Sequence, residues 1–237
     1  MTQSEAKGTA AIQKHVGRVA ASTVAGLASI GAVVFWPAGT FAWPHGWLFV
    51  TVVIANFGAN LAYLVKVNPG LIVQRTQIGP GTKRWDIVWA ACFGPLFCTV
   101  FVIAGFDAVR YGWSSMASWW WVVGIALFLP GTALLSWSMG VNPFFEKTVR
   151  IQSERGHRVI DSGPYRYARH PGYVGLLGWC LATPLLLGSW WAFLPALACC
   201  AGVGVRTALE DRTLRAELTG YEAYAQRVRF RLLPGLW

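Results

Sequence analysis

Charged residues are scarce in this sequence, and their scarcity excludes an ordinary soluble domain. Asp, Glu, Lys and Arg make up 13% of the 237 residues, about half the usual share in a soluble domain. Hydrophobic residues make up 55%, and the mean hydropathy is +0.45. A soluble fold of this length cannot hide so much apolar surface, whereas a bilayer can solvate it. We therefore expect an integral membrane protein.

Metal and redox motifs are also missing. The five cysteines all lie inside apolar runs, and no pair has the spacing of a metal or redox site. They are interpreted as small apolar fillers of helix interfaces, and no metal site is expected. A cleavable signal pattern is lacking as well, because the first apolar run is long enough to span a bilayer and no clear cleavage site follows it.

The positive charge has a placement that argues against a nucleic-acid partner. The sequence contains 20 Lys and Arg residues and 10 Asp and Glu residues, which gives a formal net charge of +10. The basic residues sit at the ends of apolar runs and between them, where they meet anionic lipid headgroups. The partner predicted by this pattern is the membrane.

About six apolar runs have the roughly 20-residue length of a membrane-spanning helix. They cover residues 16–36, 46–65, 85–106 and 119–139, then the stretch from Pro171 to Leu187, and a last run that starts at Trp190 and continues as a more polar helix past Leu214. The predicted fold is an all-α, polytopic transmembrane bundle. The short Gly188-Ser189 connection makes the last two spans an antiparallel hairpin.

The distribution of basic residues predicts the orientation of these spans. Lys and Arg gather before the first span, between the second and third, between the fourth and fifth, and after the sixth, whereas the other connections contain only Arg110. The positive-inside rule then places both termini and the two long loops in the cytoplasm. Multi-pass insertion with an even number of spans agrees with this orientation.

Ionisable residues are nearly absent from the first four spans. Asp86 and Asp107 lie close to predicted helix ends, where we expect water to reach them. Because a charge at bilayer depth tends to mark a transport pathway, its absence argues against an ion or proton pathway. The paired interrupted helices and repeats of transporters are not seen either.

The composition changes at Asn142, which divides the chain into an N-terminal region of four spans, residues 1–141, and a C-terminal region, residues 142–237. Residues 161–173 are dense in turn formers, aromatic residues and cations, and they lead directly into the fifth span. Pro171 fits the first turn of that helix, whose free amides favour anions. His170 and Tyr173, three residues apart, share a face. An interfacial membrane anchor remains an alternative for this stretch.

A second polar cluster lies at the end of the sixth span. Arg206 and Glu210 are one helical turn apart and can pair, although an exposed pair of this kind contributes only about 0.3–0.5 kcal/mol. Asp211 makes two adjacent acids where the helix meets water. Because the fifth and sixth spans are antiparallel, the end that carries His170 and the end that carries Glu210 should meet at one cytoplasmic mouth.

These two clusters resemble motifs of the isoprenylcysteine carboxyl methyltransferase and phospholipid methyltransferase superfamily. The similarity covers about residues 142–234 and rests on Gly163-Pro164-Tyr165-Arg166-Tyr167-x-Arg169-His170-Pro171-x-Tyr173-x-Gly175, on Arg206-x-x-x-Glu210-Asp211-x-x-Leu214, and on Tyr221-x-x-Tyr224. The sequence departs from the family pattern at Asp211, where the family usually has a second Glu. The shorter side chain makes a direct catalytic role of that position less secure.

The resemblance implies an S-adenosylmethionine-dependent methyltransferase with a cofactor pocket near the cytoplasmic face, formed by the C-terminal region. The cofactor-binding residues that it implies are Tyr165, Arg169, His170, Pro171, Tyr173, Gly175 and Glu210, and the catalytic residues are Arg206, Glu210 and Asp211. The acceptor would be a lipophilic small molecule or lipid that enters from the membrane. Its reacting group, a carboxylate, an amine or a thiol, stays open.

One other enzyme class shares part of the pattern. Sterol-reductase-like membrane enzymes, which use NADPH, also carry an Arg-His-Pro-x-Tyr turn and a similar basic tail. The Arg206-x-x-x-Glu210-Asp211 spacing fits the methyltransferase pattern better, and the chain is short for a sterol reductase. The methyltransferase is therefore the preferred hypothesis, with the reductase as the alternative.

Overall fold

The structure is a computed structural model that describes residue 26, residues 28–76 and residues 78–237. All regular elements in these ranges are helical. They are a helix at Ala28–Ala38, α2 (Pro44–Val67), α3 (Pro69–Gln74), α4 (Arg84–Gly105), the π-helical η1 (Phe106–Tyr111), α5 (Trp120–Val141), the 3-10 turns η2 (Ser153–Arg155) and η3 (Gly163–Arg166), α6 (Pro171–Leu187), α7 (Phe193–Glu217) and α8 (Tyr221–Arg227). The all-α prediction is confirmed.

Four helices of the described chain are long and apolar enough to cross a membrane, namely α2, α4 with η1, α5 and α7. The helix at Ala28–Ala38 and α6 are apolar but shorter. The predicted first span, 16–36, lies partly outside the described residues, and the described helix ends at Ala38 rather than at Trp36. The count of about six spans therefore stays a prediction.

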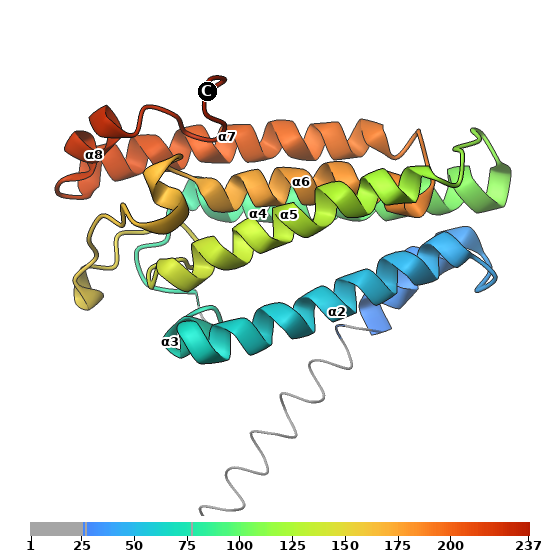
Figure 1. Ribbon diagram of the computed structural model, residues 1–237, viewed down its shortest axis with the longest axis horizontal. Helices are drawn as coiled ribbons and strands as arrows, with labels where there is room; N and C mark the ends of the chain where they lie inside the picture. Colours follow the sequence, from blue (N-terminus) through green and yellow to red (C-terminus); the bar gives the residue numbers. More distant parts are fainter. Residues whose placement is uncertain (1–25, 27, 77) are drawn as a thin grey trace, which may run out of the picture.

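The long helices run side by side along the longest axis of the molecule (Figure 1), and α2 packs against α5 and α6. The closest packing joins α5 to α6, where glycines let the two backbones approach. A Cβ atom on Gly175 would collide with the carbonyl oxygen of Gly131 and lie 2.9 Å from the Cβ of Leu135. Gly175 therefore fixes the position of α6 against α5.

The predicted hairpin of the last two spans is present. Leu187 ends α6, Gly188 follows in the left-handed conformation with a φ of 74°, and α7 begins at Phe193. The turn is held by Asp107, whose carboxylate accepts hydrogen bonds from the hydroxyls of Ser114 and Ser189 and from the backbone of Trp191. These contacts tie the hairpin to the end of η1.

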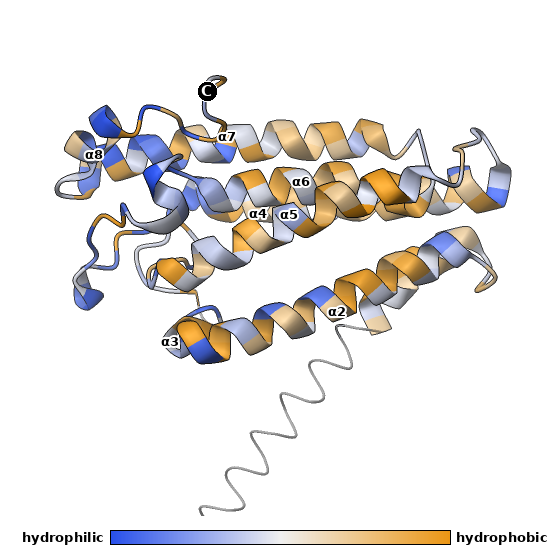
Figure 2. Cartoon of the chain, viewed as in Figure 1, coloured by the Kyte–Doolittle hydropathy of each residue, from blue (hydrophilic) through white to orange (hydrophobic). Residues whose placement is uncertain are grey.

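The polar residues gather at the opposite end of the bundle. Figure 2 shows hydrophilic colours at α8, at the end of α7 and in the loop between α5 and α6, beside largely hydrophobic helices. The sequence predicted that water would reach the two acids of the first four spans, and that prediction is wrong. Both Asp86 and Asp107 are fully buried, because each carboxylate has found protein donors in place of water.

Candidate active site

His170 and Tyr173 are positioned by the first turn of α6. Pro171 begins the helix and His170 is its N-cap residue, as predicted, because proline has no N–H that the first turn would leave unpaired. The two rings stack, with centroids 5.8 Å apart and planes inclined by 18°. The shared helical face expected from their spacing is therefore confirmed.

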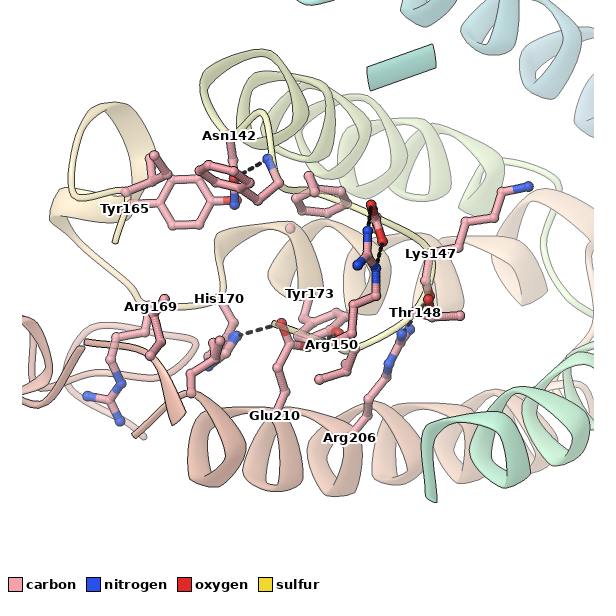
Figure 3. A pocket seen from close by; sticks show the side chains of 18 of the residues that line it. Asn142, Lys147, Thr148, Arg150, Tyr165, Arg169, His170, Tyr173, Arg206 and Glu210 are labelled. Carbon is pink, nitrogen blue, oxygen red and sulfur yellow. Dashed lines mark hydrogen bonds and ion pairs between the residues drawn. The ribbon is translucent and has the colours of Figure 1, made fainter. Parts of the chain in front are cut away.

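The last turns of α7 bring Glu210 to the same place. The hydroxyl of Tyr173 donates a very short hydrogen bond to one carboxylate oxygen of Glu210, and Nδ1 of His170 lies 4.0 Å from the other. Figure 3 shows these side chains converging from two helices. The two sequence clusters, 40 residues apart, therefore meet as the hairpin geometry predicted.

Arg206 does not pair with Glu210, although helical spacing allows it. Its Nε lies 2.9 Å from the carboxylate of Asp86, in the first turn of α4. A second guanidinium nitrogen donates to the carbonyl of Lys147 at 2.7 Å, and the group stacks 4.3 Å from the ring centroid of Trp89. Asp86 also accepts the backbone N–H of Val149 at 2.7 Å. One buried ion pair thus joins α4, α7 and the 147–149 segment.

Asp211 is saturated by basic partners behind the site. Its carboxylate receives the guanidinium of Arg169 at 2.7 Å, that of Arg231 at 3.0 Å and that of Arg215 at 3.2 Å, and the hydroxyl of Tyr221 at 3.1 Å. The side chain is only 1% exposed. These contacts favour a supporting role for Asp211 over the catalytic role that the resemblance implied.

The segment after α8 closes over the start of α6. The backbone N–H groups of Arg169 and His170 donate to the carbonyls of Phe230 and Arg231 at 3.0 and 2.9 Å. The guanidinium of Arg169 also donates to the carbonyls of Val228 and Arg229. The guanidinium of Arg169 is thus occupied by Asp211 and by these carbonyls, and it holds the segment in place. Arg169 also lines part of the cavity described next.

A cavity of about 380 Å³ lies between these elements. Six predicted site residues line it, namely Tyr165, Arg169, His170, Tyr173, Arg206 and Glu210, whereas Pro171, Gly175 and Asp211 do not. The polar part faces the α5–α6 loop, and the apolar part reaches between α4, α5 and α6, where Trp89, Phe93, Leu135, Leu176 and Trp179 line it. The cavity can therefore hold a polar group and an apolar chain together.

Several residues of the cavity wall were missed by sequence reasoning. They are Arg75, Trp89, Asn142, Glu146, Arg150 and His157. Glu146 and Arg150 form a buried bidentate ion pair at 2.8 and 2.9 Å, which stiffens the loop and raises the pKa of Arg150. Their four-residue spacing was a usable signal. Asp86 and Arg75 gave none, because their partners lie far away in the sequence.

Burial keeps the hydroxyls of the cavity wall protonated. Desolvation raises the pKa of Tyr165 and of Tyr221 well above the ordinary value, so both remain hydrogen-bond donors. Tyr165 contacts the amide of Asn142 at 3.2 Å. Desolvation lowers the pKa of His157 below its usual 6.5, and its Nδ1 accepts the backbone N–H of Gln152 at 3.3 Å. His157 is therefore neutral near pH 7.

Fold and site together define an α-helical membrane protein with an amphiphilic cavity at one polar end. Within that class, the motifs and the comparisons show a similarity to the isoprenylcysteine carboxyl methyltransferase family over part of the chain. Residues 123–216 match the model of the isoprenylcysteine carboxyl methyltransferase family. This match confirms the resemblance predicted from the motifs, and it includes most of α5, all of α6 and nearly all of α7.

Relatives of known name agree with this match over a limited length. A probable protein-S-isoprenylcysteine O-methyltransferase from Oryza sativa subsp. indica is 32% identical over 75 residues, which cover 30% of this chain and 39% of the rice protein. The protein-S-isoprenylcysteine O-methyltransferase of Xenopus laevis is 34% identical over 73 residues, covering 30% and 25%. The chain thus matches about two fifths of the first relative's length.

A solved structure extends the similarity of the fold. The eukaryotic intramembrane Ras methyltransferase, an isoprenylcysteine carboxyl methyltransferase, superimposes with a TM-score of 0.53 at 18% identity. The alignment covers 90% of this chain and 74% of that one. The N-terminal helices, which the family model does not match, therefore follow the same architecture.

Proposed function

We propose that this chain is an integral membrane methyltransferase, which transfers the methyl group of S-adenosylmethionine to a lipophilic acceptor at the cytoplasmic membrane face. The observation that carries the proposal is the meeting of His170, Tyr173 and Glu210 on the wall of an amphiphilic cavity. Fold similarity and the named relatives support the same reaction class.

The cavity wall has the groups that this donor needs. S-adenosylmethionine, when bound, supplies an electrophilic methyl group on a positively charged sulfur. Glu210 is an acid suited to the donor's α-amino group or sulfonium, and its side chain is 22% exposed toward the cavity. The stacked rings of His170 and Tyr173 offer aromatic faces that can attract a cation or cover a purine. Tyr165 and Asn142 add donors on the facing wall.

The residues of the site can align donor and acceptor for direct transfer, with no covalent intermediate on the protein. Methyl transfer is an in-line displacement, so positioning should supply much of the rate. A carboxylate acceptor is already ionised and needs no base, whereas an amine or a thiol must lose a proton, for which Glu210 is placed. The apolar part of the cavity suits the chain of an acceptor that enters from the lipid.

The proposal is tested with purified protein and two soluble ligands. S-adenosylhomocysteine should raise the unfolding temperature in detergent, and NADPH should not. Radiolabelled S-adenosylmethionine, incubated with protein and membrane lipid extract, should yield a labelled lipophilic product whose identification names the acceptor. Stabilisation by NADPH alone would instead establish the reductase alternative.

A further inference from the structure

Arg75 is a cation of the cavity wall that has no acidic partner. It follows α3, in the connection between α2 and α4, and it lines the cavity. Its guanidinium donates a 3.2 Å hydrogen bond to the carbonyl of Phe145 and lies 5.6 Å from the centroid of the Phe145 ring. Within the described ranges, no Asp or Glu carboxylate lies within 4.0 Å of it. Most donors of its guanidinium are therefore unused.

The other buried arginines around the cavity are neutralised. Arg150 pairs with Glu146 and Glu154, and Arg169 pairs with Asp211. Arg206 pairs with Asp86. The remaining cations of the wall, Lys147 and Arg158, are exposed to solvent. Among the described arginines of this wall that are not exposed, Arg75 is therefore the one without an acidic partner.

The electrostatic surroundings make this arrangement unfavourable for the empty protein. Burial and the nearby positive charge of Arg206 both lower the pKa of Arg75. A buried cation without a countercharge usually marks a site that a ligand completes, since desolvated charges in proteins are normally paired. An arginine fork matches the two oxygens of a carboxylate. The missing partner should therefore be an anion inside the cavity.

We propose that Arg75 is the carboxylate-binding residue of the cavity, contributed by the N-terminal region outside the family match. This inference rests on the proposed function. Two carboxylates can occupy the cavity under that function, the one on the amino-acid part of the donor and one on an anionic acceptor. The guanidinium of Arg75 would bind either carboxylate in the same way, and the experiment below distinguishes the donor from the acceptor.

The test uses the full chain in detergent, with Arg75→Gln as the variant that removes the charge and Arg75→Lys as the conservative one. Arg84→Gln is the matched control, because it removes one exposed positive charge of the N-terminal region that lies outside the cavity wall. Binding of S-adenosylhomocysteine is compared by calorimetry with that of 5′-methylthioadenosine, which lacks the amino-acid part. N-acetyl-S-farnesylcysteine and its carboxamide are compared in the same way.

If the donor supplies the carboxylate, Arg75→Gln weakens S-adenosylhomocysteine binding by about tenfold to a hundredfold and leaves 5′-methylthioadenosine unchanged. If the acceptor supplies it, the same loss falls on N-acetyl-S-farnesylcysteine and spares its carboxamide. Arg75→Lys should retain part of the affinity, and Arg84→Gln should retain nearly all of it.

Stability without ligand distinguishes binding from a structural role. Because Arg75 has no countercharge and is repelled by Arg206, Arg75→Gln should keep or raise the unfolding temperature. A marked fall, or unchanged affinity for all four compounds, would overturn the inference. If the wild-type protein binds neither donor compound, the proposed function itself fails, and that result is distinct from wild-type binding that ignores Arg75.

Discussion

Glu210 and His170 are the residues expected to contribute most to the rate of the proposed methyl transfer. Replacing Glu210 by Gln removes the negative charge but keeps the hydrogen bond with Tyr173, and His170→Ala removes the stacked ring. We expect each change to lower methyl transfer by about a hundredfold or more, measured with radiolabelled donor, with membrane insertion intact. Glu222→Gln, an exposed acid on α8 paired with Arg215, is the control. Full activity in both site variants would contradict the assignment.

The ion pair between Asp86 and Arg206 is expected to stabilise the fold as well as the cavity. Asp86→Asn leaves a buried guanidinium without its charge partner, and such a loss costs about 3–5 kcal/mol. Denaturant unfolding of the purified protein measures it. Adding Arg206→Gln should cost less than the sum of the single changes. Strict additivity would show that the two side chains are not coupled.

His157 predicts a pH dependence of stability. Its folded pKa is depressed by desolvation, so the unfolded chain binds more protons once the pH falls through the ordinary value near 6.5. The stabilising contribution is therefore complete above that value and decreases as the solution becomes more acidic. Unfolding temperatures at pH 7.5 and 5.5 should differ less in His157→Gln than in the wild type. An equal difference would remove His157 as the cause.

The individual residues also show the limits of sequence reasoning. Pro171 and Gly188 were placed correctly, because a proline and a glycine restrict the backbone locally. Glu210 and His170 were found through a motif. Asp86 was wrongly expected to face water, because its partner is 120 residues away and no local rule joins them. Arg75 was missed for the same reason.

At the scale of the helices, the contact between α5 and α6 decides the geometry of the site. Gly175→Ala would push a methyl group into the carbonyl of Gly131, and overpacking of this kind costs about 1–3 kcal/mol. Thermal unfolding in detergent is the measurement. Gly58→Ala on α2 is the control, since nothing lies within 4 Å of an added Cβ there. Equal tolerance at both positions would contradict the close packing.

The boundaries of the helices were more predictable from the sequence than the conformation of the 142–170 loop. Proline, glycine and runs of apolar residues fixed α2, α5 and α6 within a few residues, because hydrophobic length and helix breakers act locally. The 142–170 loop was recognised only as polar. Its shape depends on Glu146 with Arg150 and on Val149 with Asp86, contacts that combine local and distant partners.

At the scale of the whole molecule, the chain is an integral membrane protein, and its orientation is a proposal. The excess of Lys and Arg in alternate connections favours cytoplasmic termini. Tags fused to both ends should be digested by protease in inside-out vesicles and protected in right-side-out vesicles. Protection of one tag in each preparation would require an odd number of spans.

The division at residues 141 and 142 is also a proposal, and the cavity crosses it. Trp89 and Arg75 come from the N-terminal region, and the remaining wall comes mostly from the C-terminal region. Composition and motifs had located only the wall residues of the C-terminal region. The family model likewise begins at residue 123, so the contribution of α4 becomes visible only in three dimensions.

The clasp that residues 228–231 make on Arg169 and His170 has a consequence for biosynthesis. Among the groups that shape the site, these come last in the sequence, so they can join it only after every other part of its wall has been synthesised. Until then Asp211 lacks the guanidinium of Arg231, and Arg169 lacks three carbonyl acceptors, those of Val228, Arg229 and Phe230. Ligand binding should accordingly arise only once this segment has been synthesised and has docked on the start of α6.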